Sequence, residues 1–375
     1  MLPLARALAD AGHDVAFASG EPVAGEAETE GFTSFRAGLD MNSVEPLARR
    51  VRDRAASLPA SQVRHLLFAE LFVRGELEPR ANDLIDVVDQ WAPDVVVHDV
   101  AEFAAPLVAT MAGIPYVEHS YGPAIANDVI RAAGDAAAPS WSARGLAPHP
   151  LGGLYRYLYL DVCPTSLQVP GAVTGTVQAI RPVQAPPPAA QLPWLEALRA
   201  APTVYITLGT VYNRNRDVFS TLLDGLRDEP LNLIVTVGRQ NDPALLDPQP
   251  SNVHVHRFIP QELLLPHCAA VVTHGGAGST LGALAFGLPL LIVPQGADHF
   301  FNAERVTAAG AGLQLLPDRL TADSARDAVR MLLHDDTFRD AALRIENELA
   351  AMPDPHHAVE ALERLTGRRH LQHGS

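Results

Sequence analysis

The stretch VVTHGGAGSTLGALAFGLPLLIVPQGADHFFNA, residues 271–303, decides the fold of this chain. An apolar run ends at His274, a turn of glycine and alanine follows, and a helical pattern begins near Ser279. A second apolar run, LPLLIVP (288–294), comes after the helix. Strand, turn, helix and strand in this order form the repeating unit of a parallel sheet that is covered by helices.

The glycines of this turn have two explanations. Gly275, Gly276 and Gly278 carry no Cβ, so a ligand can come close to the backbone. The free N–H groups at the start of the helix point to one place and favour an anion such as a diphosphate. A tight connection between strand and helix explains the glycines equally well. The turn has neither the lysine of a Walker A loop nor GxGxxG spacing, which argues against kinases and ordinary dehydrogenases.

The composition indicates a globular protein that avoids polyanions. The 375 residues are enough for two domains, and 47% of them are apolar while 19% are charged. The formal net charge of −15 argues against nucleic acid and anionic membranes as partners. Cys163 and Cys268 form no metal-binding spacing and fit burial in a reducing compartment. Because no apolar run is long enough to span a bilayer and no signal peptide is recognisable, we expect a cytoplasmic protein.

Both halves of the chain alternate apolar strands with helices, and a proline-rich segment separates them. RPVQAPPPAAQLP (181–193) favours a stiff, extended connection. We therefore expect an α/β protein of two doubly wound, Rossmann-like domains that face a cleft. These would comprise residues 1–181 and 194–352, joined by a linker at 182–193. A helix and tail at 353–375 would pack back toward the first domain.

The individual elements follow from the apolar pattern. In the first half, strands are expected at 14–19, 93–99 and 114–120, with a weaker one at 31–37, and helices at 62–91 and 102–113. After residue 127 the pattern blurs, which predicts a mobile surface segment. In the second half, strands are expected at 203–210, 231–238, 252–258, 269–274 and 288–294, with closing helices at 321–333, 336–350 and 355–366.

Four segments together resemble the donor site of nucleotide-sugar glycosyltransferases with the GT-B fold. They are TLGT (207–210), RFIPQ (257–261), HGGAGST (274–280) and PQGADHFFNA (294–303). The resemblance is greatest to the actinobacterial enzymes that decorate macrolides, enediynes and related natural products, with the UDP-glycosyltransferases as more distant relatives. It implies a metal-independent enzyme without a cofactor. It also implies that the N-terminal domain begins with a strand that is missing here.

The same resemblance implies roles for individual residues. Phe258 would stack on the nucleobase with Gln261 beside it, unless Phe258 is simply a core residue. Asp298 and His299 would bind sugar hydroxyls and Asn302 would support their loop, although Asn302 could instead face solvent. Thr207 and Gly209 would line the cleft below the phosphates, unless Thr207 is simply a strand residue. The residues implied to hold the diphosphate are Thr210, His274, Gly275, Gly276, Ala277, Gly278, Ser279 and Thr280.

The resemblance implies an inverting reaction with a histidine base. This histidine would stand in a loop just before the helix that here begins the chain, and Asp99 would orient it. An N-cap of the next helix is the alternative role for Asp99. No residue matches the base itself, since Met1 stands inside that helix. His13 lies at its far end, and His119 is a remote second candidate.

The implied function is the transfer of a sugar, expected to be a deoxysugar, from a nucleoside diphosphate to a hydroxyl of a natural-product aglycone. Many UDP-sugar enzymes of this kind have a ribose-binding glutamate where this chain has Gly282, so a dTDP donor is favoured over UDP. Two alternatives are a short form that binds the nucleotide sugar without transfer and another GT-B enzyme such as a nucleotide-sugar epimerase. A homodimer is compatible with the resemblance, and neither nucleic acid nor membrane is expected as a partner.

Overall fold

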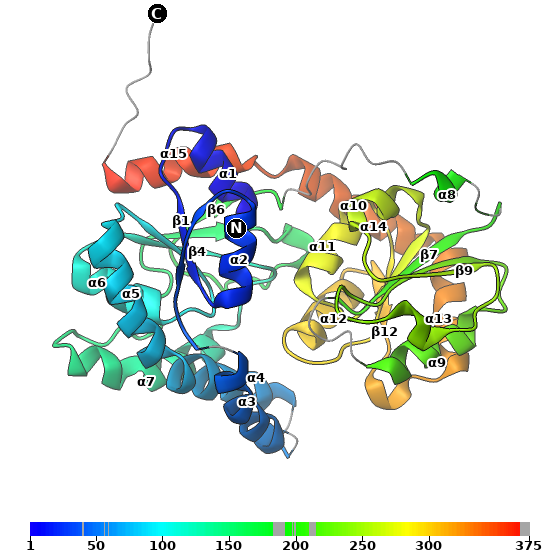
Figure 1. Ribbon diagram of the computed structural model, residues 1–375, viewed down its shortest axis with the longest axis horizontal. Helices are drawn as coiled ribbons and strands as arrows, with labels where there is room; N and C mark the ends of the chain where they lie inside the picture. The colour runs from blue at the N-terminus through cyan, green and yellow to red at the C-terminus, as the bar shows by residue number, and fades with distance from the viewer. Residues whose placement is uncertain are drawn as a thin grey trace, which may run out of the picture. The chain divides into compact units, whose positions relative to one another are not determined.

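A computed structural model describes residues 1–39, 41–55, 57–58, 60–182, 192–196, 198, 200–209 and 215–367 of the chain (Figure 1). The chain forms two compact units. Unit 1 comprises residues 1–162, 169–181 and 353–375, and unit 2 comprises 163–168 and 182–352. Each unit carries parallel strands with helices packed on them, which confirms the predicted α/β class.

Unit 2 contains a six-stranded parallel sheet with the strand order β12-β11-β10-β7-β8-β9. This is the doubly wound order in which the chain reverses direction between the first and the fourth strand, here β7 and β10. Their last residues, Thr207 and Thr273, are partners in the register. The strands are β7 (Thr203–Thr207), β8 (Asn232–Thr236), β9 (Val253–His256), β10 (Ala270–Thr273), β11 (Leu290–Ile292) and β12 (Gly312–Gln314).

Helices cover the sheet of unit 2, and their apolar faces form its core. Helices α9 (Arg216–Leu226) and α13 (Ala322–His334) pack against each other and contribute Phe219, Leu222 and Val329 to a buried cluster with strand residues. The remaining helices are α8 (Pro193–Glu196), α10 (Gln261–Leu264), α11 (Ala277–Leu284), α12 (His299–Ala308), α14 (Asp336–Ala351) and the single 3-10 turns η2 (Thr165–Leu167), η3 (Pro243–Leu246), η4 (Leu265–His267) and η5 (Pro317–Arg319).

A short piece of the first half of the chain belongs to unit 2. The Arg305 side chain of α12 donates to the carbonyl oxygens of Leu167 and Gln168, both at 2.9 Å. The backbone N–H of Ser166 donates to Glu348 of α14 at 2.9 Å. A domain boundary placed only at the proline-rich segment does not anticipate this piece, because it is held by side chains that are distant in the sequence.

Unit 1 contains two separate parallel sheets. Strand β1 (Ala16–Ser19) pairs with β2 (Thr33–Arg36), and a second sheet has the order β3-β4-β5-β6. Within the described residues β1 and β3 do not pair with each other. In a doubly wound sheet the second and the fourth strand are likewise not paired, because the first strand lies between them. The second sheet is built of β3 (Val96–Asp99), β4 (Tyr116–His119), β5 (Leu158–Asp161) and β6 (Thr176–Ala179).

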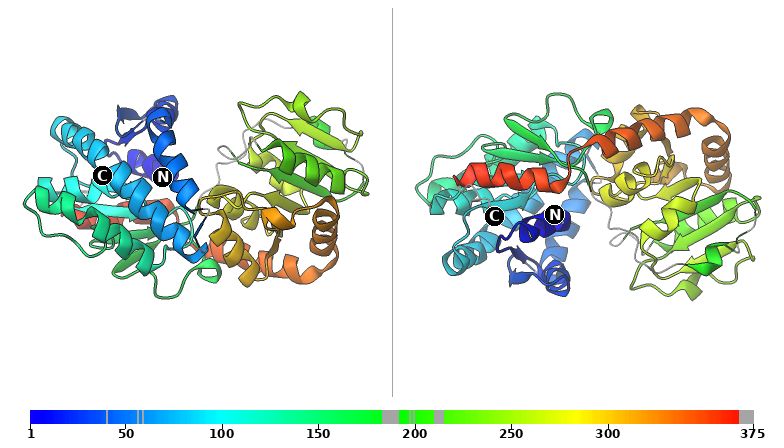
Figure 2. Two further views of the ribbon diagram at one scale, coloured as in Figure 1. Left: turned by 90° about the horizontal axis from the view of Figure 1, so that it is seen from below. Right: turned by 90° about the horizontal axis from the view of Figure 1, so that it is seen from above.

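The helices of unit 1 flank these sheets, and its two ends meet. Helix α1 (Leu2–Asp10) packs against α15 (Pro355–Thr366), and His13 Nε2 lies 3.1 Å from Glu363 Oε1. Figure 2 shows both helices on the same unit. The helical region predicted at 62–91 is broken into three pieces, one of them a π-helix. The other helices are α2 (Glu21–Thr29), α3 (Met41–Ala55), α4 (Ala60–Leu66), η1 (π, Leu67–Gly75), α5 (Leu77–Trp91), α6 (Ala104–Ala112) and α7 (Asn127–Ala143).

The prediction of a mobile surface segment after residue 127 is wrong. Helix α7 spans 17 residues there and buries Ile130, Ala133 and Trp141 in the core of unit 1. Its small residues allow a close approach, because a Cβ added at Gly134 would lie 2.5 Å from the carbonyl oxygen of Pro150. Alanine and glycine carry a weak apolar pattern even where they are buried, so the sequence conceals this helix.

Candidate functional site

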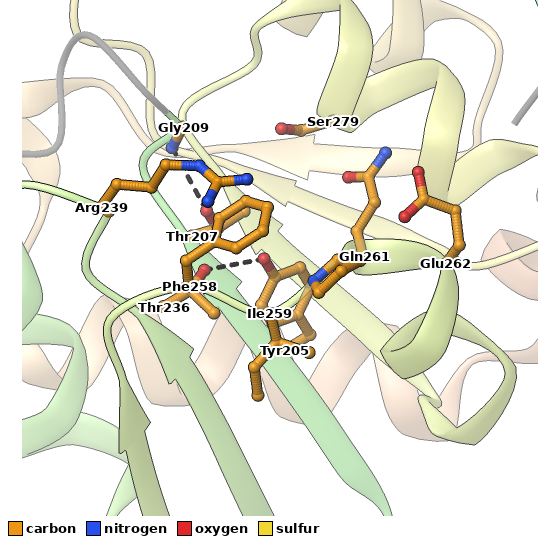
Figure 3. A pocket seen from close by; sticks show the side chains of 12 residues that line it. Tyr205, Thr207, Gly209, Thr236, Arg239, Phe258, Ile259, Gln261, Glu262 and Ser279 are labelled. Carbon is orange, nitrogen blue, oxygen red and sulfur yellow. Dashed lines mark hydrogen bonds between the residues drawn. The ribbon is translucent and has the colours of Figure 1, made fainter. Parts of the chain in front are cut away.

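The predicted donor residues gather at the carboxyl ends of β7 and β10, where the strand order of unit 2 reverses. Ligands of doubly wound sheets bind in the crevice at this point. A cavity of about 260 Å³ opens there (Figure 3). Its walls come from the ends of β7 and β8, from the loop after β9 and from the starts of α10 and α11. The lining residues are Tyr205, Thr207, Gly209, Thr236, Gly238, Arg239, Phe258, Ile259, Pro260, Gln261, Glu262 and Ser279.

The His274 ring packs closely against two glycines. A Cβ added at Gly209 would lie 2.5 Å from its Cε1, and one added at Gly276 would lie 2.4 Å from its Nε2. The ring is buried, and its Nδ1 lies 3.2 Å from the hydroxyl of Thr273. Burial, together with the neighbouring imidazole of His299, lowers the pKa of His274 to about 3. The imidazole is therefore neutral at physiological pH.

The two explanations of the glycine turn apply to different glycines. Gly275 has φ +93°, and a Cβ there would lie 2.7 Å from the side chain of Ile292. Gly275 and Gly276 are therefore required by the packing of the turn itself. Gly278, by contrast, is exposed and has no atom within 4 Å of an added Cβ. Packing does not account for Gly278, whereas close approach of a ligand does.

The start of α11 offers hydrogen-bond donors next to the cavity. Gly276 caps this helix without a side-chain cap, so the N–H groups of the first turn have no acceptor from a capping side chain. Ser279 lines the cavity, and the buried hydroxyl of Thr280 makes no hydrogen bond within the described part of the chain. Such a helix start binds anions through its N–H groups and its dipole.

Asn302 ties the predicted sugar-binding loop to the glycine turn. Its side chain is 3% exposed and donates to the carbonyl oxygen of Gly275 at 2.8 Å and to Asp298 Oδ2 at 2.7 Å. The alternative that Asn302 faces solvent is therefore wrong. Because a buried amide with both partners in place is costly to remove, the loop and the turn form one rigid assembly.

His299 belongs to the same assembly. Its ring lies edge-on to that of His274, with 4.4 Å between the ring centroids. Its Nδ1 accepts from the backbone N–H groups of Gln295 at 3.3 Å and Gly296 at 3.2 Å, and burial lowers its pKa. Nδ1 is thus already engaged by the loop, while sugar contacts from His299 and Asp298 stay predictions.

Phe258 is not a core residue, because its side chain is 40% exposed and lines the cavity. The guanidinium carbon of Arg239 lies 3.6 Å from the centroid of its ring. Gln261 Nε2 donates to the carbonyl oxygen of Gly278 at 3.5 Å, which brings the predicted nucleobase and diphosphate residues together. Base stacking on Phe258 stays a prediction.

Hydroxyl-bearing side chains on β7 and β8 also line the cavity, namely those of Tyr205, Thr207 and Thr236. Thr207 is buried, and its hydroxyl accepts from the N–H of Gly209 at 3.2 Å. Thr210 lies outside the described residues. No sequence motif singles out Tyr205 or Thr236, whose hydroxyls lie 2.7 Å apart on neighbouring strands. The rule that ligands bind at strand ends would have found Thr236, since it ends β8.

The carboxylate next to the donor cavity stands at an unexpected position. Gly282, which occupies the place of a ribose-binding glutamate, is buried inside α11. Glu262, the second residue of α10, lines the cavity instead. The absence of a glutamate at position 282 therefore does not leave the cavity without a carboxylate.

Asp99 lies at the carboxyl end of β3 in unit 1, with its Oδ1 accepting from the N–H of Ala101 at 2.7 Å. The N-cap alternative is wrong: α6 begins at Ala104, and Glu102 accepts from its first N–H groups. Burial lowers the pKa of the Met1 amino group, and the nearby charge of Asp99 opposes this shift. The charge of Asp99 is therefore felt at the start of α1.

The other histidines of this region are held by the backbone. His119 is the register partner of Asp99, and its Nδ1 donates to the carbonyl oxygen of Ser120 at 2.6 Å. Burial and the Met1 amino group lower the pKa of His119 to about 4. His98 donates from Nδ1 to the Asp99 carbonyl oxygen at 2.8 Å, and its Nε2 lies 3.7 Å from the buried Glu118.

The described residues contain neither a cluster of metal ligands nor a helix that could span a membrane. No group of three or more histidine, cysteine, aspartate or glutamate side chains there is arranged to hold a metal ion. No helix in the described ranges is both long and apolar enough to cross a membrane. Cys163 and Cys268 are not joined by a disulfide, and burial raises the pKa of Cys268 to about 12.

Comparison with known proteins places this arrangement in a family. Residues 6–209 match the N-terminal domain, and residues 220–365 the C-terminal domain, of the family described as erythromycin biosynthesis protein CIII-like. The L-demethylnoviosyl transferase of Streptomyces niveus is 37% identical over 372 residues, with 96% of this chain and 93% of the relative covered.

Solved structures agree over nearly the whole chain. The spinosyn rhamnosyltransferase SpnG has a TM-score of 0.82 at 25% identity, covering 97% of this chain and 95% of that chain. The glycosyltransferase VinC, solved in complex with dTDP, has a TM-score of 0.78 at 28% identity, covering 98% and 96%. The family matches, the overall likeness and the cavity at the strand ends agree with one another. The chain therefore belongs to the erythromycin biosynthesis protein CIII-like glycosyltransferases, which have the GT-B fold and act in natural-product biosynthesis.

Proposed function

We propose that this chain transfers a deoxysugar from a dTDP-sugar to a hydroxyl group of a natural-product aglycone, with inversion at the anomeric carbon. The observation that carries the donor half is the exposed Gly278 at the uncapped start of α11, beside a cavity with an exposed aromatic ring. The relatives support the sugar class, since they include demethylnoviosyl and rhamnosyl transferases.

The donor site stabilises the leaving group. The diphosphate accepts from the N–H groups at the start of α11 and from the hydroxyls of Ser279 and Thr280, while the nucleobase stacks on Phe258. As the bond between the anomeric carbon and the phosphate oxygen breaks, its electron pair passes to the diphosphate. Fixed N–H dipoles stabilise this charge without reorganisation, which is how such donors lower a barrier.

The acceptor half rests on Asp99. The acceptor oxygen attacks the anomeric carbon from the face opposite the diphosphate, and its proton passes to a base. The family resemblance implies that this base is an imidazole directly before α1, a position that no residue identified above fills. A carboxylate on the far nitrogen of this imidazole fixes its tautomer and stabilises the imidazolium. The electrostatic effect of Asp99 on the start of α1 supports this role, because the family resemblance expects the base directly before this helix.

A dTDP donor is favoured over UDP by the likeness to VinC, whose structure holds dTDP. The carboxylate of Glu262 accepts from a sugar hydroxyl of the nucleoside, and a deoxyribose offers it the 3′-hydroxyl. A ribose offers both hydroxyls, so Glu262 alone does not exclude UDP.

Binding and transfer are tested separately. We expect dTDP to raise the melting temperature of the chain more than UDP or GDP at equal concentration. Transfer is measured with a panel of dTDP-deoxysugars and hydroxylated aglycones by mass spectrometry, and NMR of the product reports the anomeric configuration. Binding of dTDP without turnover would support the short-form alternative. Retention of configuration would refute the inverting mechanism.

A further inference from the structure

The proposal concerns Arg239, which lies on the exposed face of Phe258 in the donor cavity. The guanidinium carbon is 3.6 Å from the ring centroid (Figure 3). This is well within the 6 Å at which a cation is attracted to the face of an aromatic ring. The guanidinium is flat, and it occupies the layer in which a nucleobase would stack on the same ring face.

The backbone aims Arg239 at the cavity. Strand β8 ends at Thr236, and Gly238 follows with φ +95°, a conformation that L side chains rarely adopt. The turn at Gly238 directs the next residue back over the strand ends, where both residues line the cavity.

The side chain of Arg239 has few polar restraints. It is exposed and stacks on the ring of Phe258, and among the described residues it makes no ion pair and no hydrogen bond. It is also the single cationic side chain among the residues that line the cavity. An arginine held by stacking alone can lift at little energetic cost, because no hydrogen bond has to break.

We propose that Arg239 caps the nucleobase of the donor. In the empty site it rests on Phe258, and when the donor enters it lifts so that the base lies between the guanidinium and the ring. Arginine stacks on flat aromatic faces, and bases gain affinity from such stacking whatever their hydrogen-bonding pattern. This inference rests on the proposed function, in that it takes the occupant of the cavity to be a nucleoside diphosphate.

The experiment compares thymidine, dTMP and dTDP, which share the base and differ in charge. Binding of each to the wild type, Arg239→Ala and Arg239→Lys is measured by calorimetry at two salt concentrations. If Arg239 caps the base, Arg239→Ala weakens all three ligands by the same factor, about 3- to 30-fold. Arg239→Lys restores little of this loss, because the flat guanidinium is missing.

Other outcomes overturn the proposal. A loss that grows from thymidine to dTDP, falls with salt and is rescued by lysine would make Arg239 a partner of the diphosphate. Tighter binding by Arg239→Ala would make it a competitor of the base. An unchanged affinity of Arg239→Ala for all three ligands would exclude a role of Arg239 in donor binding.

A matched control is Arg344→Ala, which removes the same charge from an exposed position of α14 outside the cavity lining. We expect it to bind all three ligands as the wild type does. If the wild type itself fails to bind dTDP, the proposed function fails together with this inference. If the wild type binds dTDP and Arg239→Ala changes nothing, the inference alone fails.

Discussion

Two single-methyl substitutions in the glycine turn separate packing from ligand binding. In Gly276→Ala the added Cβ would lie 2.4 Å from Nε2 and 2.9 Å from Cε1 of His274. Heavy atoms in contact normally keep about 3.5–4.0 Å, and this ring is held by Thr273 and by the edge of His299. The backbone of Gly276, at φ −61° and ψ 142°, is open to alanine, so the penalty is steric.

The expected loss follows from the size of the overlap. Overpacking of a rigid site costs about 1–3 kcal/mol. In a domain the size of unit 2, each kcal/mol lowers the melting temperature by about 2–4 °C, so we expect Gly276→Ala to melt roughly 2–12 °C lower. Scanning calorimetry and thermal-shift measurements on the purified chain report this change. A variant that melts as the wild type does would refute the close packing of the His274 ring against Gly276.

Gly278→Ala is the matched partner, because its added Cβ meets no atom within 4 Å. Alanine is favoured over glycine in a helix by up to about 1 kcal/mol, so the melting temperature stays level or rises. If the diphosphate lies against this backbone, the methyl group pushes it away, and dTDP binding weakens about tenfold or more, equivalent to about 1.4 kcal/mol. Wild-type affinity for dTDP in a folded Gly278→Ala would contradict the ligand explanation of this glycine.

Further predictions concern stacking, the rigid loop, pH and the core of unit 1. Phe258→Ala should weaken dTDP binding by about 1–3 kcal/mol in calorimetry while leaving the melting temperature unchanged, and Phe258→Trp should retain binding. Asn302→Ala should lower the free energy of unfolding in urea by about 1–3 kcal/mol, because it leaves a buried carbonyl oxygen unpaired. Since the folded pKa of His274 is about 3 and the unfolded one 6.5, stability should fall as pH drops below about 6.5, by up to about 1.4 kcal/mol per pH unit, and less steeply in His274→Asn; equal slopes would refute this. Gly134→Ala should destabilise unit 1 by about 1–3 kcal/mol without affecting dTDP binding, and a normal melting curve would contradict the tight packing of α7.

The strands with the clearest sequence signal are those whose apolar residues run without interruption. Val95 to Val97 and Leu290 to Val293 are examples, because a parallel strand is covered on both faces. Strands β5, β6 and β12 were not predicted: β6 reads TVQA with two exposed positions, and β12 reads GLQ with a single large apolar residue. Helix α7 escaped because its buried face is mostly alanine and glycine. In each case the packing partner, which is distant in the sequence, decides the structure.

The site was predicted where its residues are close in sequence and missed where the fold assembles them. The turn at 274–280 and its link through Asn302 belong to one continuous stretch. Arg239 and Glu262 enter the cavity from the end of β8 and the start of α10, and neither stands in a pattern of its own. Their signal is topological: once β7 is known to be the reversal point, the loop after the adjacent β8 must border the ligand.

The glycine turn shows why a motif should not be assigned to one role as a whole. Gly275 and Gly276 serve the packing of Ile292 and His274, so substituting them perturbs the fold before any ligand arrives. Loss of dTDP binding in those variants would therefore say nothing about the diphosphate. Gly278 lies two residues further along the same helix start and is free of packing, so only there does a methyl group probe the ligand directly.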